Sequence, residues 1–287
     1  MLFSKPNEFV GILFAIFAYF SFSILDAFQK TAIIHHSIFQ LLFIKYIFIL
    51  FLSCCEVQRK KNYKFWKTNN IKLQILRGFL SIMESGCFVL SFRYLSLADV
   101  HSVGSLTPII VVILSALILK ETVSPKTWIA IFVGFVGVLI ILRPGLSIFD
   151  IKSLLPLVAA FFLGLYQVVT RKVSENDSAE TSLFYNSVIG LSAMSILAFI
   201  YWQPINFISY FLFISIGLFF SIGMYFQIIA LSKARASVIQ PFHYTLIFWS
   251  IILGYLIYDD IPDLFTIVGA CIITVSGIYA LNQRIKE

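Results

Sequence analysis

The sequence predicts an all-α polytopic membrane protein in which ten transmembrane helices form two inverted five-helix repeats. Three observations predict this class: the composition, a series of uncharged apolar runs, and a pattern that occurs twice along the chain. Of the 287 residues, 60% are hydrophobic and 12% are charged, whereas about a quarter of the residues in soluble proteins are charged. Many of the apolar runs are about 20 residues long, which is the length of an α-helix that crosses a bilayer.

The apolar runs place ten helices along the chain, joined by short connections. The longest polar connection runs from Arg59 to Lys72. Because no Gly/Ser-rich linker separates domains, we expect one compact bundle of two halves, residues 1–146 and 147–287, joined near Pro144–Ile151. The expected helices cover residues 8–29, 37–56, 73–94, 97–119, 126–142, 152–172, 181–201, 206–231, 235–257 and 263–282.

A pattern in the middle of the chain returns near the C-terminus. Between Tyr94 and Leu142, an apolar run with Pro108 is followed by a charged break and by a second apolar run with two glycines. Between Ile229 and Leu281 the same order recurs, starting with Pro241. In the first copy the charged residues are Lys120, Glu121 and Lys126, and the glycines are Gly134 and Gly137. In the second copy the charged residues are Asp259, Asp260 and Asp263, and the glycines are Gly269 and Gly277. A duplicated unit of this size decides the architecture of a chain.

The distribution of lysine and arginine predicts how the helices are oriented. With the N-terminus in the cytoplasm, fifteen of these residues fall in cytoplasmic segments and four in external ones. Cytoplasmic loops carry such an excess, so we expect both termini in the cytoplasm and the protein in a bacterial inner membrane. A unit with an odd number of helices is inverted when it is repeated. In agreement, the lysine-rich loop after the second helix corresponds to Trp202–Asn206, which has neither Lys nor Arg.

Composition and motifs exclude several classes of function. The net charge of +7 comes from basic residues scattered between apolar runs, which indicates membrane topology rather than a nucleic-acid partner. The chain has no G-x-x-x-x-G-K-[ST], H-E-x-x-H or G-x-S-x-G motif, so we expect neither direct use of ATP nor an enzyme. We also expect no cofactor and no metal, because no C-x-x-C pair occurs among the cysteines, which are Cys54, Cys55, Cys87 and Cys271.

Several short motifs resemble one family of transporters. They are the P-x12-E run from Pro108 to Glu121 with the glycine-patterned helix after it, the segment Pro241–Tyr279, the D-A-x-x-K of the first helix (Asp26, Ala27, Lys30), and the L-R-G that opens the third (Leu76, Arg77, Gly78). In this order they are similar to the EamA-type drug/metabolite transporters, and most to the bacterial branch with S-adenosylmethionine and riboflavin uptake transporters. The resemblance implies a ten-helix transporter that works by alternating access.

Two positions depart from that branch. Where it often has arginine in the second helix, this chain has Lys45, and where it often has arginine before the tyrosine of the ninth helix, this chain has His243. The resemblance therefore leaves the cargo open between an S-adenosylmethionine-like, a riboflavin-like and an amino-acid-like compound.

Ionisable residues inside the expected helices mark a candidate site, because each costs about 2.5–3.5 kcal/mol at the centre of a membrane helix. Asp26 and Lys30 lie four residues apart on one face of the first helix. They form either a local ion pair or a gate near the outer mouth. We expect Lys45, in the second helix, to face a central cavity and to meet an anionic group or Glu84.

Glu84 lies in the middle of the third helix, on a small polar face with two serines and a glycine. A carboxyl group at this depth is protonated or paired, because desolvation disfavours its charged form. It is therefore either a proton-coupling group or the structural partner of Lys45 or Arg77. We place Arg77 with Asp26 and Lys30 as a residue of a gate or an ion pair.

Uncharged polar side chains complete the candidate site. Pro241 frees a backbone carbonyl and bends the ninth helix, so we expect its neighbours Gln240, His243 and Tyr244 to line the cavity. Histidine titrates near neutrality and can relay a proton. A planar cargo would suit further uncharged polar side chains of the second half, namely Tyr166, Gln167, Thr170, Tyr185, Asn186, Tyr225 and Gln227.

These features favour a secondary transporter of a small organic metabolite, driven by protons or by exchange. The alternatives are a membrane-embedded enzyme, for which no nucleophile–base or metal constellation is visible, and a non-catalytic membrane scaffold, which does not account for polar residues at mid-depth. The expected partners are a small-molecule substrate and the lipid bilayer, and no nucleic acid. A homodimer stays open.

Overall fold

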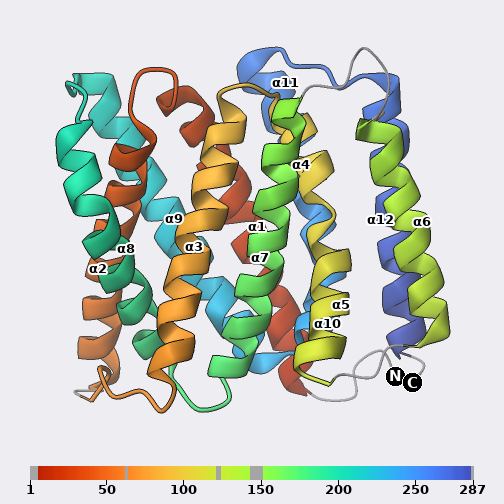
Figure 1. The fold of residues 1–287 in the computed structure, drawn as a ribbon, viewed down its shortest axis with the longest axis horizontal. Helices are drawn as coiled ribbons and strands as arrows, with labels where there is room; N and C mark the ends of the chain where they lie inside the picture. The colour runs from red at the N-terminus through yellow and green to blue at the C-terminus, as the bar shows by residue number, and fades with distance from the viewer. Residues whose placement is uncertain (1–5, 62–63, 121–123, 143–150, 286–287) are drawn as a thin grey trace.

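The computed structural model describes residues 6–61, 64–120, 124–142 and 151–285, and every regular element in these ranges is a helix (Figure 1). The prediction of an all-α fold is confirmed for this part of the chain. Glu121 and most of the junction expected near Pro144–Ile151 lie outside it. In order, the elements are α1 (Pro6–Ala32), α2 (Ile38–Lys60), α3 (Ile71–Phe92), α4 (Leu97–Gly104), α5 (Thr107–Ile118), α6 (Pro125–Leu142), η1 (Ile151–Ser153), α7 (Leu154–Val173), α8 (Ala179–Ile200), α9 (Phe207–Lys233), α10 (Ala236–Ile239), η2 (Gln240–Tyr244), α11 (Thr245–Tyr258) and α12 (Leu264–Ile285).

Polar capping residues define where several of these helices begin. Ser37, Ser96, Ser178 and Asn206 precede α2, α4, α8 and α9, and the side-chain oxygen of each accepts a hydrogen bond from a backbone N–H three residues further on. Each cap satisfies one of the donors that have no partner at the start of a helix, and contributes about 1 kcal/mol. The apolar runs therefore begin at defined polar residues at the edges of the bundle.

Two of the expected helices are interrupted. The sequence predicted continuous helices over residues 97–119 and 235–257, but α4 ends at Gly104 and α5 begins at Thr107, just before Pro108. In the second half, α10 passes into the 3-10 turn η2, which contains Pro241, before α11 begins. Proline has no N–H and clashes with the preceding turn, so a proline inside each run ends the regular helix. The backbone polar groups next to such a break are available to a cavity.

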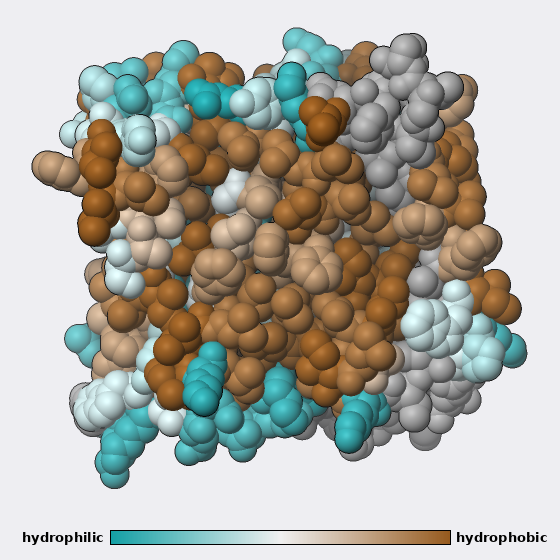
Figure 2. Space-filling view, viewed as in Figure 1, coloured by the Kyte–Doolittle hydropathy of each residue, from teal (hydrophilic) through white to brown (hydrophobic). Residues whose placement is uncertain are grey.

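The length and composition of the helices identify a multi-pass membrane protein. Among the described residues, seven helices are long and apolar enough to cross a membrane, counting α4 and α5 as one run. Three shorter apolar helices cover Trp128–Ile141, Phe242–Tyr258 and Leu264–Ser276. Figure 2 shows apolar side chains as a broad band across the molecule, with hydrophilic residues gathered at the two rims.

The main helix contacts join the first half of the chain to the second. α1 packs along α9, α2 along α8, α3 along α7 and α6 along α12, while α4 and α5 contact α11 and α10. The start of α1, the connection from α2 to α3 and the end of α12 lie on the same side of the bundle, which faces down in Figure 1. The last turn of α2 and that connection contain Arg59, Lys60, Lys61, Lys64 and Lys67, so we call this side the lysine-rich side and the other the opposite side.

Glycines of the repeated pattern bring α6 and α12 together. A Cβ atom on Gly137 would lie 3.0 Å from the carbonyl oxygen of Gly269, and one on Gly269 would lie 2.7 Å from that of Gly137. Neither position has room for a side chain, so glycine at both lets the two backbones touch. The glycine pattern that marks the repeat in the sequence therefore serves packing between the halves.

Candidate functional site

A cavity lies between the two halves of the chain. Its lining brings together four of the predicted site residues, Asp26, Lys45, Glu84 and His243, with the neutral Gln227. The first half contributes the carboxylates and the lysine, whereas the second contributes apolar side chains, an amide and a histidine. The complete lining is Tyr19, Phe22, Leu25, Asp26, Gln29, Lys45, Glu84, Ser85, Phe88 and His101 from the first half, and Leu163, Phe220, Met224, Gln227, His243 and Leu246 from the second.

Lys45 is the cation of this cavity, and only 1% of its surface is exposed. Its Nζ donates to Gln29 Oε1 at 2.8 Å and to Ser85 Oγ. The ammonium also lies 4.2 Å from the centre of the Phe220 ring, close enough for a cation–π contact. A buried charge is stable only when polar groups replace its water, and here three helices supply those groups.

Asp26 is connected to Lys45 through Gln29. Its Oδ1 accepts a hydrogen bond from Gln29 Nε2 at 2.8 Å, and its Oδ2 lies 3.0 Å from His101 Nε2, off the axis of a regular hydrogen bond. Gln29 therefore bridges Asp26 and Lys45. A continuous chain of polar contacts runs from His101 on α4 through α1 to Lys45 on α2 and Ser85 on α3.

Of the two alternatives for Asp26 and Lys30, the local ion pair is not formed. Lys30 Nζ instead lies 2.5 Å from Asp260 Oδ2, in the connection between α11 and α12. A spacing of four residues places two side chains on one face but does not decide which neighbours they meet. Here Asp26 turns into the cavity, where Gln29 and His101 engage it.

Glu84 lines the cavity and is 8% exposed. In the described part of the chain its carboxylate makes no ion pair within 4 Å, so the expected structural pairs with Lys45 and Arg77 are not formed. Arg77 lies two turns away on α3 and donates to Gln74 Oε1 at 3.2 Å, to Tyr166 OH at 3.2 Å and to the Ser182 carbonyl. Its hydrogen bonds link α3 to α7 and α8, and Arg77 is not part of the cavity lining.

His243 and Tyr19 present polar atoms to the cavity without a protein partner. Their rings meet edge to face, with centroids 5.0 Å apart. Among the described residues, His243 Nε2 and Tyr19 OH are buried and have no hydrogen-bond partner. Buried polar groups of proteins are nearly always hydrogen-bonded, so these two atoms point to a ligand or to water in the cavity.

Three predicted residues lie next to the cavity but outside its lining. Gln240 Nε2 donates to Gln167 Oε1 at 2.5 Å, which joins η2 to α7. The Tyr166 hydroxyl accepts from Arg77 and donates to Met224 Sδ at 2.9 Å. These contacts use the Tyr166 hydroxyl and one atom of each amide, whereas Gln167 Nε2 and Gln240 Oε1 are buried without a hydrogen-bond partner among the described residues. The assignment of the three residues to substrate binding stays a prediction.

Tyr185, Tyr225 and Tyr244 lie further from the cavity lining. The Tyr185 hydroxyl donates to the Trp66 carbonyl at 2.7 Å, and the Tyr225 hydroxyl donates to Glu56 Oε2 at 3.0 Å, both on the lysine-rich side. Tyr244 is buried in an apolar cluster that surrounds η2. The sequence assigned these tyrosines to the site for their polar and aromatic character, which does not determine the depth at which each lies.

Gln29 and His101, together with Tyr19, are polar cavity residues that sequence reasoning missed. Gln29 follows Asp26 by three residues and so shares its face of α1, which is a signal that the pattern contained. His101 is a lone histidine in an apolar run with no polar motif around it, and only the fold brings it to Asp26. No group of three or more His, Cys, Asp or Glu side chains in the described ranges is arranged to hold a metal ion.

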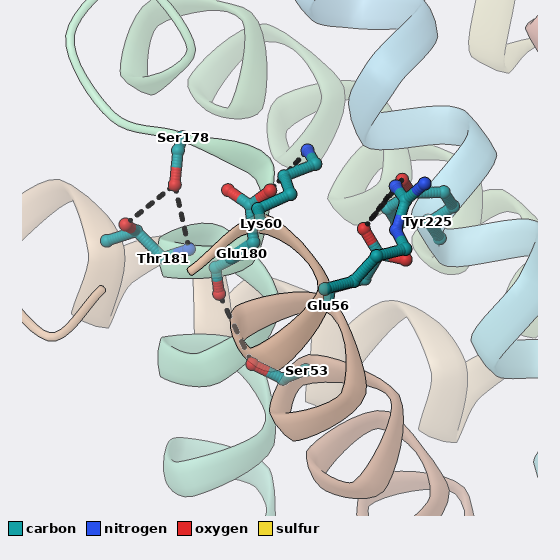
Figure 3. Close-up of polar contacts among 8 residues, drawn as sticks. Ser53, Glu56, Lys60, Ser178, Glu180, Thr181 and Tyr225 are labelled. Carbon is teal, nitrogen blue, oxygen red and sulfur yellow. Dashed lines mark hydrogen bonds and ion pairs between the residues drawn. The ribbon is translucent and has the colours of Figure 1, made fainter. Parts of the chain in front are cut away.

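Polar contacts join the two halves on the lysine-rich side of the cavity (Figure 3). Glu56 of α2 accepts from Arg59 at 2.7 Å and from Tyr225 of α9 at 3.0 Å. Lys60 forms an ion pair with Glu180 of α8, and Ser53 donates to the Glu180 carbonyl at 3.3 Å.

A second set of contacts joins the halves on the opposite side. Besides the pair of Lys30 with Asp260, the Tyr258 hydroxyl of α11 donates to the Ala27 carbonyl at 2.5 Å and lies 2.6 Å from Thr31 Oγ1. The cavity therefore lies between two sets of polar contacts, each of which links helices of different halves.

Comparison with known proteins agrees with the motifs in the sequence. The EamA-like transporter family matches residues 9–143 and again residues 151–282. Similar proteins include a riboflavin transporter of Vibrio cholerae, 27% identical over 77% of this chain and 75% of its own, and an S-adenosylmethionine uptake transporter of Rickettsia prowazekii, 26% identical with the same coverage. A pseudopaline exporter of Pseudomonas aeruginosa is 23% identical over 96% of this chain and 97% of its own.

A solved crystal structure shares the fold. Its TM-score is 0.74, and the alignment covers 96% of this chain and 99% of that one at 14% sequence identity. The two matches to the family extend over nearly all of the sequence. The chain therefore belongs to the EamA-like transporter family, and it is a multi-pass membrane transporter rather than an enzyme.

Proposed function

We propose that the protein is a secondary transporter that moves a small organic metabolite across a bacterial inner membrane by alternating access. The observation that carries this proposal is the cavity between the halves, where Asp26, Lys45 and Glu84 are buried together. Ionisable side chains at such depth are expensive and mark substrate or ion pathways in membrane proteins. Sites between the repeats, near the middle of the membrane, are typical of secondary transporters.

The arrangement of the helices supports ten crossings in two inverted repeats. If the first five crossings correspond to the last five, a two-fold relation exchanges the α1–α9 contact with the α3–α7 contact, and the α2–α9 contact with the α3–α8 contact, and all four are present. The same relation maps the α2–α8 and α6–α12 contacts onto themselves. α1 and its counterpart α7 run in opposite directions in Figure 1. Helices broken at a proline occur in the fourth run of each half, as in transporters with inverted repeats.

The excess of lysine and arginine on one side supports an orientation with both termini in the cytoplasm. The lysine-rich side carries the connection from α2 to α3, together with the start of α1 and the end of α12. Because such an excess marks the cytoplasmic side, we assign the lysine-rich side to the cytoplasm.

Alternating access would use the two sets of contacts between the halves as gates. Breaking the Lys30–Asp260 pair would open the cavity to the outside, and breaking the contacts of Glu56 and Glu180 would open it to the cytoplasm. Both sets are small and partly exposed, so each is weak enough to break and reform. A cargo that binds one state better shifts the population between the two.

The names of the relatives suggest which cargo to test first. A riboflavin transporter and S-adenosylmethionine uptake transporters are among the similar proteins, so we propose a cargo of the size of these metabolites, S-adenosylmethionine-like, riboflavin-like or amino-acid-like. The aromatic rings of Tyr19, Phe22, Phe88 and Phe220 in the cavity suit a planar group.

Uptake into proteoliposomes that contain only this protein tests the proposal. We expect labelled S-adenosylmethionine, riboflavin or an aromatic amino acid to accumulate chemically unchanged, above the level in protein-free liposomes. If none of these compounds, and none from a wider metabolite library, enters or stabilises the reconstituted protein, the proposed function is wrong.

A further inference from the structure

Lys45 is a buried ammonium without an anion in contact. In the described part of the chain no carboxylate oxygen lies within 4 Å of its Nζ, although Asp26 and Glu84 line the same cavity. Its two hydrogen bonds go to uncharged acceptors, Gln29 Oε1 and Ser85 Oγ. An ammonium has three donors, so one N–H is left for another group.

We propose that Lys45 binds a carboxylate of the cargo and that Gln29, anchored by Asp26 and His101, is the residue that positions it. This inference rests on the proposed transport function and makes it more specific, because it commits the cargo to a compound with a carboxylate group. Riboflavin, which has none, would then not be the cargo.

The hydrogen bonds from Gln29 to Asp26 and Lys45 allow only one orientation of its side-chain amide. Asp26 can only accept hydrogen bonds and Lys45 can only donate them. The amide must therefore turn its nitrogen to Asp26, at 2.8 Å, and its oxygen to Lys45, also at 2.8 Å. Gln29 is 2% exposed, so water does not compete for these contacts. The amide thus fixes the direction in which the ammonium points.

The contact of His101 with Asp26 fixes the position of the carboxylate that Gln29 is bonded to. His101 Nε2 lies 3.0 Å from Asp26 Oδ2 and comes from α4, the helix that ends at the first break. Both oxygens of Asp26 are engaged, one by Gln29 and one by His101. Asp26 therefore meets Lys45 through Gln29 rather than by direct contact.

The other charges of the cavity favour a single carboxylate over a phosphate group. Lys45 is the only lysine or arginine in the lining, and Glu84 faces the same space. Phosphate groups are typically bound by arginine clusters or by several backbone N–H donors, and Glu84 would repel a second negative charge. Glu84, whose carboxylate makes no ion pair among the described residues, instead suits a hydrogen-bond-donating group of the same cargo.

The anion-binding unit belongs entirely to the first half of the chain. His101, Asp26, Gln29, Lys45 and Ser85 come from α4, α1, α2 and α3, and the second half faces them with Phe220, Met224 and His243. When the halves rearrange, the unit can move without losing its internal hydrogen bonds. The carboxylate of the cargo would therefore stay bound to the first half while access changes sides.

Pairs of probes that differ only in a carboxylate test the inference. The pairs are S-adenosylmethionine with its decarboxylated amine, and L-tryptophan with tryptamine, and binding to the purified protein is measured by isothermal titration. We expect at least one carboxylate compound to bind about tenfold or more tightly than its partner. We also expect Gln29→Met to remove most of this preference by weakening only the carboxylate compound, since one charge-assisted hydrogen bond corresponds to about a tenfold change in Kd.

Two further variants separate positioning from folding. Gln40→Met removes another buried glutamine of the opposite side, which donates to the Gln203 carbonyl at 3.1 Å, and we expect it to leave the carboxylate preference unchanged. His101→Gln keeps a polar side chain next to Asp26 and should retain more of the preference than His101→Leu. A purely structural role for Gln29 would instead lower the folded yield and weaken both members of each pair equally.

The outcomes distinguish this inference from the proposed function. Equal binding of both members of each pair, or an unchanged preference in Gln29→Met, overturns the inference. So does uptake of riboflavin in the absence of binding by either carboxylate compound, although that result would support transport. If no probe is bound or taken up at all, both the transport function and the inference built on it are wrong.

Discussion

Lys30 Nζ lies 2.5 Å from Asp260 Oδ2, so an ion pair joins the end of α1 to the connection before α12, 230 residues further along the chain. Both side chains are partly exposed, at 15% and 33%. The pair therefore contributes about 1 kcal/mol or less, which is small enough for a contact that opens in each transport cycle. The Tyr258 hydroxyl, bonded to the Ala27 carbonyl at 2.5 Å, closes the same side next to it.

Breaking this pair should favour the state that is open on the opposite side. A single cysteine at Phe88, which lines the cavity, reports access when the four native cysteines are replaced. We expect Lys30→Ala to increase its labelling by an impermeant thiol reagent several-fold, because about 1 kcal/mol changes a two-state ratio by about fivefold. The exchanged pair Lys30→Asp with Asp260→Lys should restore slow labelling. Unchanged labelling in Lys30→Ala would show that the pair is no gate.

The contact of Tyr225 with Glu56 should act in the same way on the lysine-rich side. Tyr225→Phe removes a hydrogen bond of 3.0 Å to a carboxylate, and we expect it to lower the free energy of unfolding by about 1–2 kcal/mol and to change the uptake rate. Tyr201→Phe is the matched control, because Tyr201 is exposed and lies at the other side. Thermal unfolding in detergent and uptake at equal protein levels check the prediction. Equal effects of both substitutions would contradict it.

Labelling of two single-cysteine variants tests the proposed topology. In a variant without native cysteines, we expect Pro204→Cys to react with an impermeant thiol reagent added to intact cells, and Lys64→Cys to react only after the cells are opened. Both residues are exposed, and Pro204 is preferable to Asn206, whose side chain caps α9. Equal labelling of the two from outside would overturn the inverted-repeat orientation.

Glu84 is the candidate for proton coupling. Its carboxylate makes no ion pair among the described residues and faces the cavity, so its charge can depend on whether water reaches it from either side. We expect uptake to respond to an imposed pH gradient, and Glu84→Gln to remove that response while exchange of cargo continues. Glu175→Gln, an exposed carboxylate that pairs with Lys172, should behave like the wild type. A gradient response that survives in Glu84→Gln would exclude this residue and leave the histidines of the cavity as titratable candidates.

The sequence predicted an all-helical chain with several apolar segments because uncharged runs of membrane length are a strong, local signal. It could not predict where the runs at Pro108 and Pro241 break, since a proline either kinks a helix or ends it depending on its neighbours. Glycine spacing indicated the repeat, and the contact of Gly137 with Gly269 shows why those glycines are needed.

The site was harder to predict than the fold. Asp26, Lys45, Glu84 and His243 were found because charge and polarity inside a membrane run are costly and therefore conspicuous. The pairing of Asp26 with His101 joins different helices, and nothing in the local sequence specifies it. Tyr225 shows the opposite error, because a polar side chain on an inward face can serve a contact near the surface instead of the cavity.

The central claim is that the cavity between the halves is the transport site, and uptake by Lys45→Ala tests it most directly. Lys45→Ala and His243→Ala are compared with the wild type and with Lys172→Ala, which removes an exposed lysine of the lysine-rich side. All variants are reconstituted at equal amounts, and folding is checked by size-exclusion chromatography. We expect both cavity variants to be folded and to lose uptake, while Lys172→Ala keeps it. Folded Lys45→Ala and His243→Ala proteins with wild-type uptake kinetics would show that the cargo is carried elsewhere.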